Sequence, residues 1–178
     1  LARGRKIIGI ATRGGTMQTA RLYRMMPPQI LEQLLAEDRY LLVSLDYEDV
    51  TPLGEWINEK YGAGKFVWHP SVVWHYDYQH TASLIAATDA VVTITQTVAH
   101  LSAAMGHPTF VLTPSRPDWR MGLTGESWCW YPNQTTRLLR QIGDDWTPAG
   151  LRLQELLGAR SPASDGPLWP HERELLDG

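Results

Sequence analysis

Cysteine is nearly absent from this sequence, since Cys129 is the only one among 178 residues. An internal disulfide is therefore excluded, and one thiol fits a reducing compartment, so we expect a cytoplasmic protein. No apolar stretch approaches the ~18 residues that a transmembrane helix needs. The first residues, LARGRKIIGI, contain neither an initiator methionine nor the apolar core of a signal peptide. We expect a piece of a longer protein without a transmembrane segment.

Excess charge of either sign is also lacking, because 16 Lys and Arg residues stand against 19 Asp and Glu residues. This balance predicts no general affinity for nucleic acid or for an acidic membrane. The spacing of His69, His75 and His80 relative to Cys129 does not fit a zinc site, and we expect no metal. Phenylalanine is scarce with 2 residues, whereas the 8 tryptophans concentrate toward the C-terminal half.

Apolar runs of about five residues alternate along the chain with amphipathic stretches of about ten. This alternation predicts an α/β fold, a Rossmann-like doubly wound parallel sheet of five or six strands with helices on both faces. Strands are predicted at residues 7–11, 40–45, 65–68, 90–94 and 109–113, with a weaker sixth at 137–141. Helices are predicted at residues 29–37, 52–61, 79–88, 97–105 and 148–157.

The length fits a single domain, which we place at residues 1–158. Residues 159–178 are rich in Pro, Gly and Ser and are predicted to be a C-terminal tail. In the usual doubly wound order the first and fourth strands are neighbours, and ligands bind at the carboxyl ends of these strands. The loops TRGGTMQT and TQT leave the predicted sheet at that point.

The first of these loops has the residue types of an anion site. Gly14 and Gly15 can adopt a positive φ and let the backbone approach a ligand, while Arg13 and Thr16 offer a cation and a hydroxyl to phosphate oxygens. The pattern is not GxGxxG, and a glycine pair after a strand is also typical of a simple turn.

The second loop, Thr95-Gln96-Thr97, opens a predicted helix whose free amides and dipole favour an anion. A threonine there also serves as an ordinary N-cap without any ligand. His100 lies one turn further on, and we predict that it contacts the ligand; the alternative is a packed, hydrogen-bonded histidine. The neighbouring Val98, Leu101 and Met105 are expected to face the core.

After the second strand, SLDYED supplies Asp46 and Tyr47 where nucleotide-binding domains often contact the ribose or the base. A solvated loop explains this segment equally well.

The long aromatic loop TPSRPDWRMGLTGESWCWYP also indicates function, because loops of this length usually bind ligands or cover a core. The candidate binding residues lie nearest its strand and are Ser115, Asp118, Trp119 and Arg120. The alternative is a lid of tryptophans over the sheet edge, which we expect of Trp128 and Trp130.

Taken together, the segments IGIATRGGT, LLVSLDYED, TASLIAATDAVVTITQTVAHLSAAMGHPTFVL, PSRPDWRMGLTGESWCWYP and RLLRQIGDDW resemble the carboxy-terminal domain of GT-B glycosyltransferases related to heptosyltransferase family nine. The branch fused to tetratricopeptide repeats is the most similar, and the resemblance covers about residues 6–146. It implies a donor domain that holds the diphosphate of a nucleotide-sugar without metal or other cofactor. Carried over, the diphosphate contacts are Gly15, Thr16, Gln96, Thr97 and His100.

Two features depart from that family. Many relatives have Asp where this chain has Thr95, and the N-terminal Rossmann-like acceptor domain, which usually supplies the catalytic base, is absent. The resemblance therefore implies binding by this chain, and turnover only together with such a domain in the same or another chain. Two alternatives stay open: a non-catalytic nucleotide-binding or scaffold module of the same fold, and a dinucleotide-dependent oxidoreductase, against which the missing GxGxxG counts.

Overall fold

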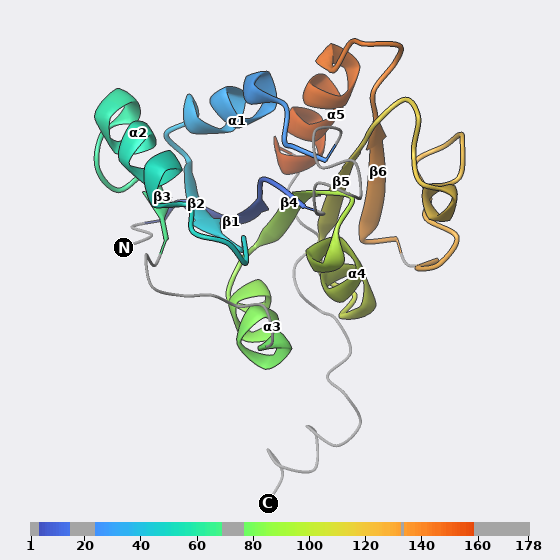
Figure 1. Ribbon diagram of the computed structural model, residues 1–178, viewed down its shortest axis with the longest axis horizontal. Coiled ribbons are helices and arrows are strands. Elements are labelled where there is room, and N and C mark those ends of the chain that lie inside the picture. The colour runs from blue at the N-terminus through green and yellow to red at the C-terminus, as the bar shows by residue number, and fades with distance from the viewer. Residues whose placement is uncertain (1–3, 15–23, 69–76, 133, 159–178) are drawn as a thin grey trace, which may run out of the picture.

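The computed structural model describes residues 4–14, 24–68, 77–132 and 134–158. Within them six strands form one parallel sheet in the order β3-β2-β1-β4-β5-β6 (Figure 1). The strands are β1 (Lys6–Ala11), β2 (Tyr40–Ser44), β3 (Phe66–Val67), β4 (Ala90–Ile94), β5 (Thr109–Thr113) and β6 (Thr136–Arg140). The predicted doubly wound α/β fold is confirmed, including the sixth strand that had only a weak pattern. The predicted tail, residues 159–178, lies outside the described residues.

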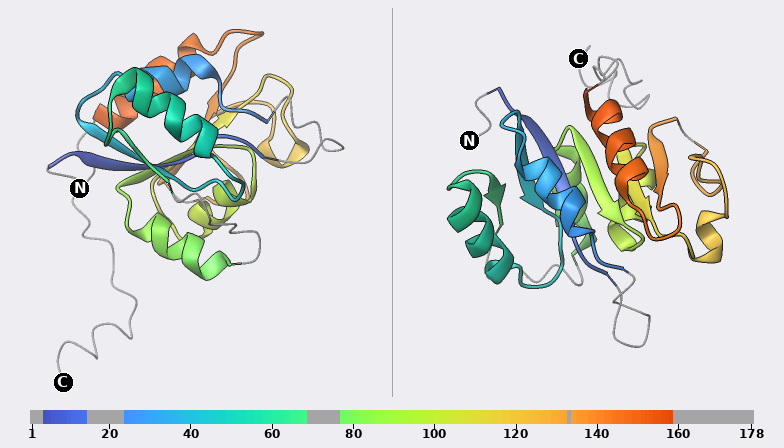
Figure 2. Two further views of the ribbon diagram at one scale, coloured as in Figure 1. Left: turned by 60° about the vertical axis from the view of Figure 1, so that its left-hand side comes forward. Right: turned by 90° about the horizontal axis from the view of Figure 1, so that it is seen from above.

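In the described part of the chain, five α-helices cover the two faces of the sheet (Figure 2). The helices α1 (Pro28–Leu35), α2 (Thr51–Tyr61) and α5 (Thr147–Gly158) pack on one face, and α3 (Tyr78–Ala86) and α4 (Thr97–Ala104) on the other. No helix in the described part of the chain combines the length and the apolar character that crossing a membrane requires.

The strands at the centre of the sheet are apolar on both faces, because helices bury both. In β4, Val92 joins the core beneath α1 and α5, whereas Val91 joins the core beneath α3 and α4, and both are fully buried. Successive side chains of a strand point to opposite faces, so a continuous apolar run fills both cores. The run AVVTI is therefore the sequence signature of a strand covered on both sides.

The winding of the sheet reverses between β1 and β4, which pair side by side in the register Ile8 to Ala90 and Ala11 to Thr93. Connections on the two sides of this point lead to opposite ends of the sheet, which leaves a crevice at the carboxyl ends of the strands. The predicted neighbourhood of the first and fourth strands is confirmed, and it brings the loops after β1, β2 and β4 to one edge.

Helix α4 lies close to the sheet because its inner residues are small. Ala99, Ser102 and Ala103 are buried, and the hydroxyl of Ser102 lies 2.6 Å from the hydroxyl of Thr109 in β5. The expectation that Met105 faces the core was wrong, since it follows the helix end and is 39% exposed. Ser102 takes an inner position because its small side chain finds a polar partner on the sheet.

Candidate functional site

The loop after β1 begins as an antiparallel pair with the segment that leads into α1. The amide of Gly14 donates to the carbonyl of Arg24 at 3.0 Å, and the amide of Met26 donates to the carbonyl of Thr12 at 2.7 Å. Both ends of the loop are therefore fixed at the carboxyl end of β1, on the edge where β1 meets β4.

Gly14 of this loop allows close packing and does not serve an unusual backbone angle. Gly14 does not adopt the positive φ that a glycine allows. A Cβ atom at Gly14 would lie 2.7 Å from the Cβ of Gln96, so the loops after β1 and β4 touch at this position. Gly15 and Thr16, also predicted to bind phosphate, lie outside the described residues.

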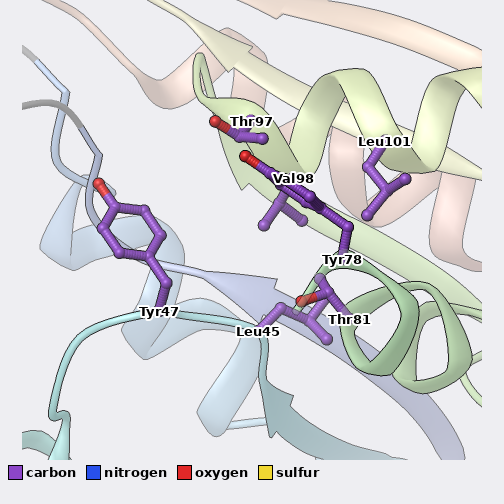
Figure 3. Close-up of a pocket in the computed structure, with 7 residues that line it drawn as sticks. All are labelled: Leu45, Tyr47, Tyr78, Thr81, Thr97, Val98 and Leu101. Carbon is purple, nitrogen blue, oxygen red and sulfur yellow. The ribbon is translucent and has the colours of Figure 1, made fainter. Parts of the chain in front are cut away.

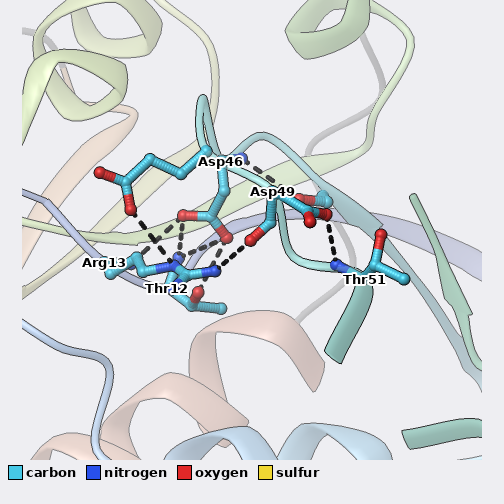
Figure 4. A network of polar contacts seen from close by, with 7 residues as sticks. Thr12, Arg13, Asp46, Asp49 and Thr51 are labelled. Carbon is cyan, nitrogen blue, oxygen red and sulfur yellow. Dashed lines mark hydrogen bonds and ion pairs between the residues drawn. The ribbon is translucent and has the colours of Figure 1, made fainter. Parts of the chain in front are cut away.

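Asp46 is buried beneath the loop after β1 and organises it (Figure 4). Its Oδ1 accepts hydrogen bonds from the amides of Thr12 at 2.8 Å and Arg13 at 3.2 Å, and its Oδ2 accepts one from the Thr12 hydroxyl at 2.8 Å. Burial raises the pKa of Asp46 to about 6, although these hydrogen bonds oppose the rise. The carboxylate predicted to contact a ribose or base thus has both oxygens occupied by the protein.

Arg13 points away from α4. Its Nη2 donates to the carbonyl of Asp49 at 2.6 Å, and its Nε lies 3.9 Å from a carboxylate oxygen of Glu48, both in the loop after β2. Its side chain lines a cavity of about 370 Å³ together with Leu31 and Trp56, on the face of the sheet that carries α1 and α2. The structure therefore separates Arg13 from the loop Thr95-Gln96-Thr97, with which the sequence had grouped it.

A pocket of about 210 Å³ opens between α3, α4 and the loop after β2 (Figure 3). Tyr47 stands on one side of it, and Tyr78, Thr97 and Leu101 line the other side. The remaining lining residues are Leu45, Thr81 and Val98. Two phenol rings and an apolar floor suit a flat, partly polar ligand group.

The first turn of α4 borders this pocket through Thr97, whose side chain is exposed. Gln96 precedes the helix in extended conformation and its side chain does not cap it. In α3, by contrast, the Asp77 side chain accepts the amide of His80 at 2.9 Å. Because the first amides of a helix need acceptors from outside, the start of α4 is available to an anion.

Thr95 and Gln96 are both buried between the two loops. The Gln96 Nε2 donates to the Thr93 hydroxyl at 3.4 Å, while its Oε1 has no hydrogen-bond partner among the described residues. A buried amide oxygen without a donor is unfavourable.

His100 packs into an aromatic cluster on the other side of α4. Its Nδ1 lies 3.0 Å from the Tyr131 hydroxyl, and its ring lies 4.7 Å from that of Trp128 and 5.9 Å from that of Trp130. Burial and the positive charge of Arg120 lower the pKa of His100, so the neutral ring is favoured. The structure shows the packed, hydrogen-bonded histidine of the alternative interpretation; contact with a ligand stays a prediction.

The loop between β5 and β6 brings charge to the same edge. Asp118 caps a 3₁₀ helix at Trp119–Met121, bonds the Arg120 guanidinium at 2.5 Å, and lies 3.7 Å from the Arg24 guanidinium. Three predicted site residues therefore lie together here. The amide of Ser115, another predicted site residue, donates to the side chain of Gln141 at 3.2 Å.

Arg24 and Tyr78 lie at this edge and were not predicted from the sequence. Tyr78 is the first residue of α3, the helix that follows β3. Such a helix starts at the carboxyl edge of a parallel sheet, so the predicted helix start could have identified Tyr78. Nothing in the local pattern marks Arg24, because its ion pair with Asp118 spans most of the chain. Of the two tryptophans expected in a lid, Trp128 is buried, but Trp130 is 47% exposed.

Comparison with known proteins gives a weak similarity. No family model matches the chain. The chain is similar to Protein FlbA of Caulobacter vibrioides, with 26% identity over 142 residues, which cover 79% of this chain and 23% of FlbA. The chain thus spans about a quarter of the length of that relative.

Among the described residues, no group of three or more His, Cys, Asp or Glu side chains is arranged to hold a metal ion.

Proposed function

We propose that this chain is the donor-binding domain of a metal-independent GT-B glycosyltransferase that binds a nucleoside diphosphate sugar in the cytoplasm. The observation that carries the proposal is the 210 Å³ pocket at the carboxyl edge of the sheet, bordered by the uncapped first turn of α4. The resemblance of the sequence to such domains supports it.

The diphosphate lies at the start of α4 in this proposal, where the free amides and the Thr97 hydroxyl donate to its oxygens. The nucleoside enters the pocket between Tyr47 and Tyr78. Pockets that enclose a whole ligand usually measure ~300–1000 Å³. A volume of about 210 Å³ therefore fits one part of the ligand, and the rest extends along the sheet edge.

The charges beside α4 favour an anion. Arg24 and Arg120 share the single carboxylate of Asp118, which leaves an excess of positive charge on the side of α4 opposite the pocket. Cations at the mouth of a crevice raise the local concentration of an anionic ligand. Asp118 holds the two guanidinium groups in place.

Glycosyl transfer requires a base that removes the proton from the acceptor hydroxyl while the nucleoside diphosphate departs. We assign to this chain the stabilisation of the departing diphosphate, by the amides of α4 and by the two guanidinium groups. The base belongs to an N-terminal Rossmann-like domain in the same or another chain. This chain alone then binds the donor and does not turn it over.

A thermal-shift screen with UDP, GDP and ADP tests the binding. A nucleotide present at about 100 times its Kd adds about 2.7 kcal/mol to the free energy of unfolding, which a melting curve detects. We expect the shift to persist in EDTA. No shift with any of the three nucleotides would contradict donor binding, and a shift abolished by EDTA would contradict only its independence from metal.

The variant Thr97→Pro tests the contact with α4. The residue before it, Gln96, is extended at φ −152° and ψ −176°, as proline requires of its predecessor, so the helix should form normally. Loss of one amide donor should weaken nucleoside diphosphate binding roughly ten- to a hundredfold. Thr97→Ala is the matched control, because it removes the hydroxyl and keeps the amide. Equal affinity of Thr97→Pro and Thr97→Ala would refute the contact.

A further inference from the structure

Two indole rings form a corner on the surface of the loop between β5 and β6. Trp119 is 73% exposed and Trp130 is 47% exposed, and their ring centroids lie 5.5 Å apart with an interplanar angle of 69°. The guanidinium of Arg120 lies over both rings, 5.0 Å from the centroid of Trp119 and 6.0 Å from that of Trp130. Exposed tryptophan is unfavourable in water, so a surface pair of this kind calls for an explanation.

The corner is held firmly by the residues beneath it. The amide of Tyr131 donates to the carbonyl of Trp128 at 2.9 Å, which closes a tight turn that places Trp128 in the core and Trp130 outside. The indole Nε1 of Trp128 donates to the carbonyl of Arg120 at 2.9 Å. Arg140 of β6 donates to four carbonyls of the same loop, at 2.6 to 3.2 Å. The exposure of the two rings is therefore built into the fold.

The corner also lies beside the proposed donor site. The ring of His100, in the second turn of α4, contacts Trp130 on the side away from the nucleotide pocket. Asp118, which caps the 3₁₀ helix that begins with Trp119, also contacts Arg24 near the start of α1. A ligand that extends past the first turn of α4 on this side meets the two indoles.

We propose that Trp119 and Trp130 stack a pyranose ring, an inference that rests on the proposed function. A pyranose has apolar C–H faces that fit an indole face, and hydroxyls at its rim that fit planar charged groups such as those of Asp118 and Arg120. A dry protein interface is less suitable, because it would desolvate the Arg24, Asp118 and Arg120 charges. A hydroxylated sugar hydrogen-bonds them and leaves them hydrated.

The sugar has two possible sources, the donor nucleotide-sugar or an acceptor saccharide, and one set of variants distinguishes them. The variants are Trp119→Ala and Trp130→Ala, with Trp56→Ala as control. Trp56 is 39% exposed in α2 and makes an edge contact with Tyr61, on the opposite face of the sheet. Circular dichroism melting verifies that each variant is folded, and Trp119→Phe and Trp130→Phe retain a ring at each position.

Calorimetric titrations use UDP, GDP and ADP, then UDP-glucose, GDP-mannose and ADP-glucose, and finally maltotetraose and chitotetraose. If the donor supplies the sugar, each alanine variant should weaken the nucleotide-sugar at least fivefold, leave the nucleoside diphosphate within twofold, and be partly rescued by Phe. If the acceptor supplies it, the same loss appears with an oligosaccharide alone. Trp56→Ala should behave as the unmodified chain in every titration.

The inference is overturned if the Trp119→Ala and Trp130→Ala variants bind every saccharide and nucleotide-sugar with the same affinity as Trp56→Ala. It is also overturned if they lose affinity for nucleoside diphosphate and for nucleotide-sugar equally. An effect confined to association with another protein would also overturn it. The proposed function fails separately, when no nucleoside diphosphate binds the unmodified chain. In that case oligosaccharide binding that depends on Trp119 and Trp130 would still support the stacking corner.

Discussion

The replacement Asp46→Asn should change how the stability of the domain depends on pH. The pKa of Asp46 rises from 3.8 in the unfolded chain to about 6 in the fold, because the carboxyl group is buried. The folded state therefore binds this proton more tightly, and protonation of Asp46 stabilises the fold at low pH. Its contribution is fully present below about pH 4 and is lost as the pH rises through about 6.

The magnitude follows from the two pKa values. Each pKa unit corresponds to about 1.4 kcal/mol, so the full effect is at most about 3 kcal/mol, of which about 2 kcal/mol falls between about pH 4.5 and about pH 7.5. In Asp46→Asn the new side chain would keep one oxygen for the amides of Thr12 and Arg13, and its NH₂ group would donate to the Thr12 hydroxyl, which in the unmodified chain donates to Asp46. The variant should therefore fold, and it lacks the carboxyl group that titrates at this position.

Urea unfolding at several pH values measures this directly. The free energy of unfolding of the unmodified chain minus that of Asp46→Asn should fall by about 2 kcal/mol from about pH 4.5 to about pH 7.5. This difference removes the contributions of His100 and His107, whose pKa values are lowered by burial and which act in the opposite direction. Asp49→Asn is the control, since the pKa of this exposed neighbour is lowered by hydrogen bonds from Thr51. A difference that is flat or that rises with pH would refute the reasoning.

Three further substitutions test the packing around the site by urea unfolding. Gly54→Ala should lower the free energy of unfolding by about 1–2 kcal/mol in spite of its better helix propensity, because its Cβ would lie 2.4 Å from the Trp68 ring; greater stability would contradict this. Arg140→Met should lower the free energy of unfolding by about 1–3 kcal/mol and speed amide exchange in the aromatic loop. Arg137→Met should do neither, because it removes a hydrogen bond to the neighbouring Thr136 carbonyl and, among the described residues, none to that loop. His100→Ala should lower the free energy of unfolding by about 1–3 kcal/mol at about pH 8 and by less at about pH 5.5, because burial of the neutral ring lowers its pKa. An equal loss at both pH values would count against that burial.

The sequence by itself determined the architecture and the edge of the sheet to which the loops after β1, β2 and β4 lead. The strands β4 and β5 are buried along their whole length, and such runs are typical of a parallel sheet covered by helices on both faces. Helix α4 begins at Thr97, as predicted from the polar hinge before it, and ends one residue earlier than predicted. For β3 only Phe66 and Val67 pair, at the outer edge of the sheet, where less pairing is possible than the predicted four residues suggested. Local periodicity contains this information because each element must bury its own apolar side.

Only the tertiary structure decided what the candidate residues do. Asp46, for which a ligand contact was predicted, fixes the loop after β1, and Arg13 turns toward the loop after β2. His100 takes its aromatic neighbours from a segment about thirty residues away, and Arg24 pairs with Asp118 of the loop between β5 and β6. These contacts depend on how irregular loops fold back over the sheet. Periodicity along the chain does not determine such loops, because their conformation is set by partners that are distant in sequence and adjacent only once the sheet has formed.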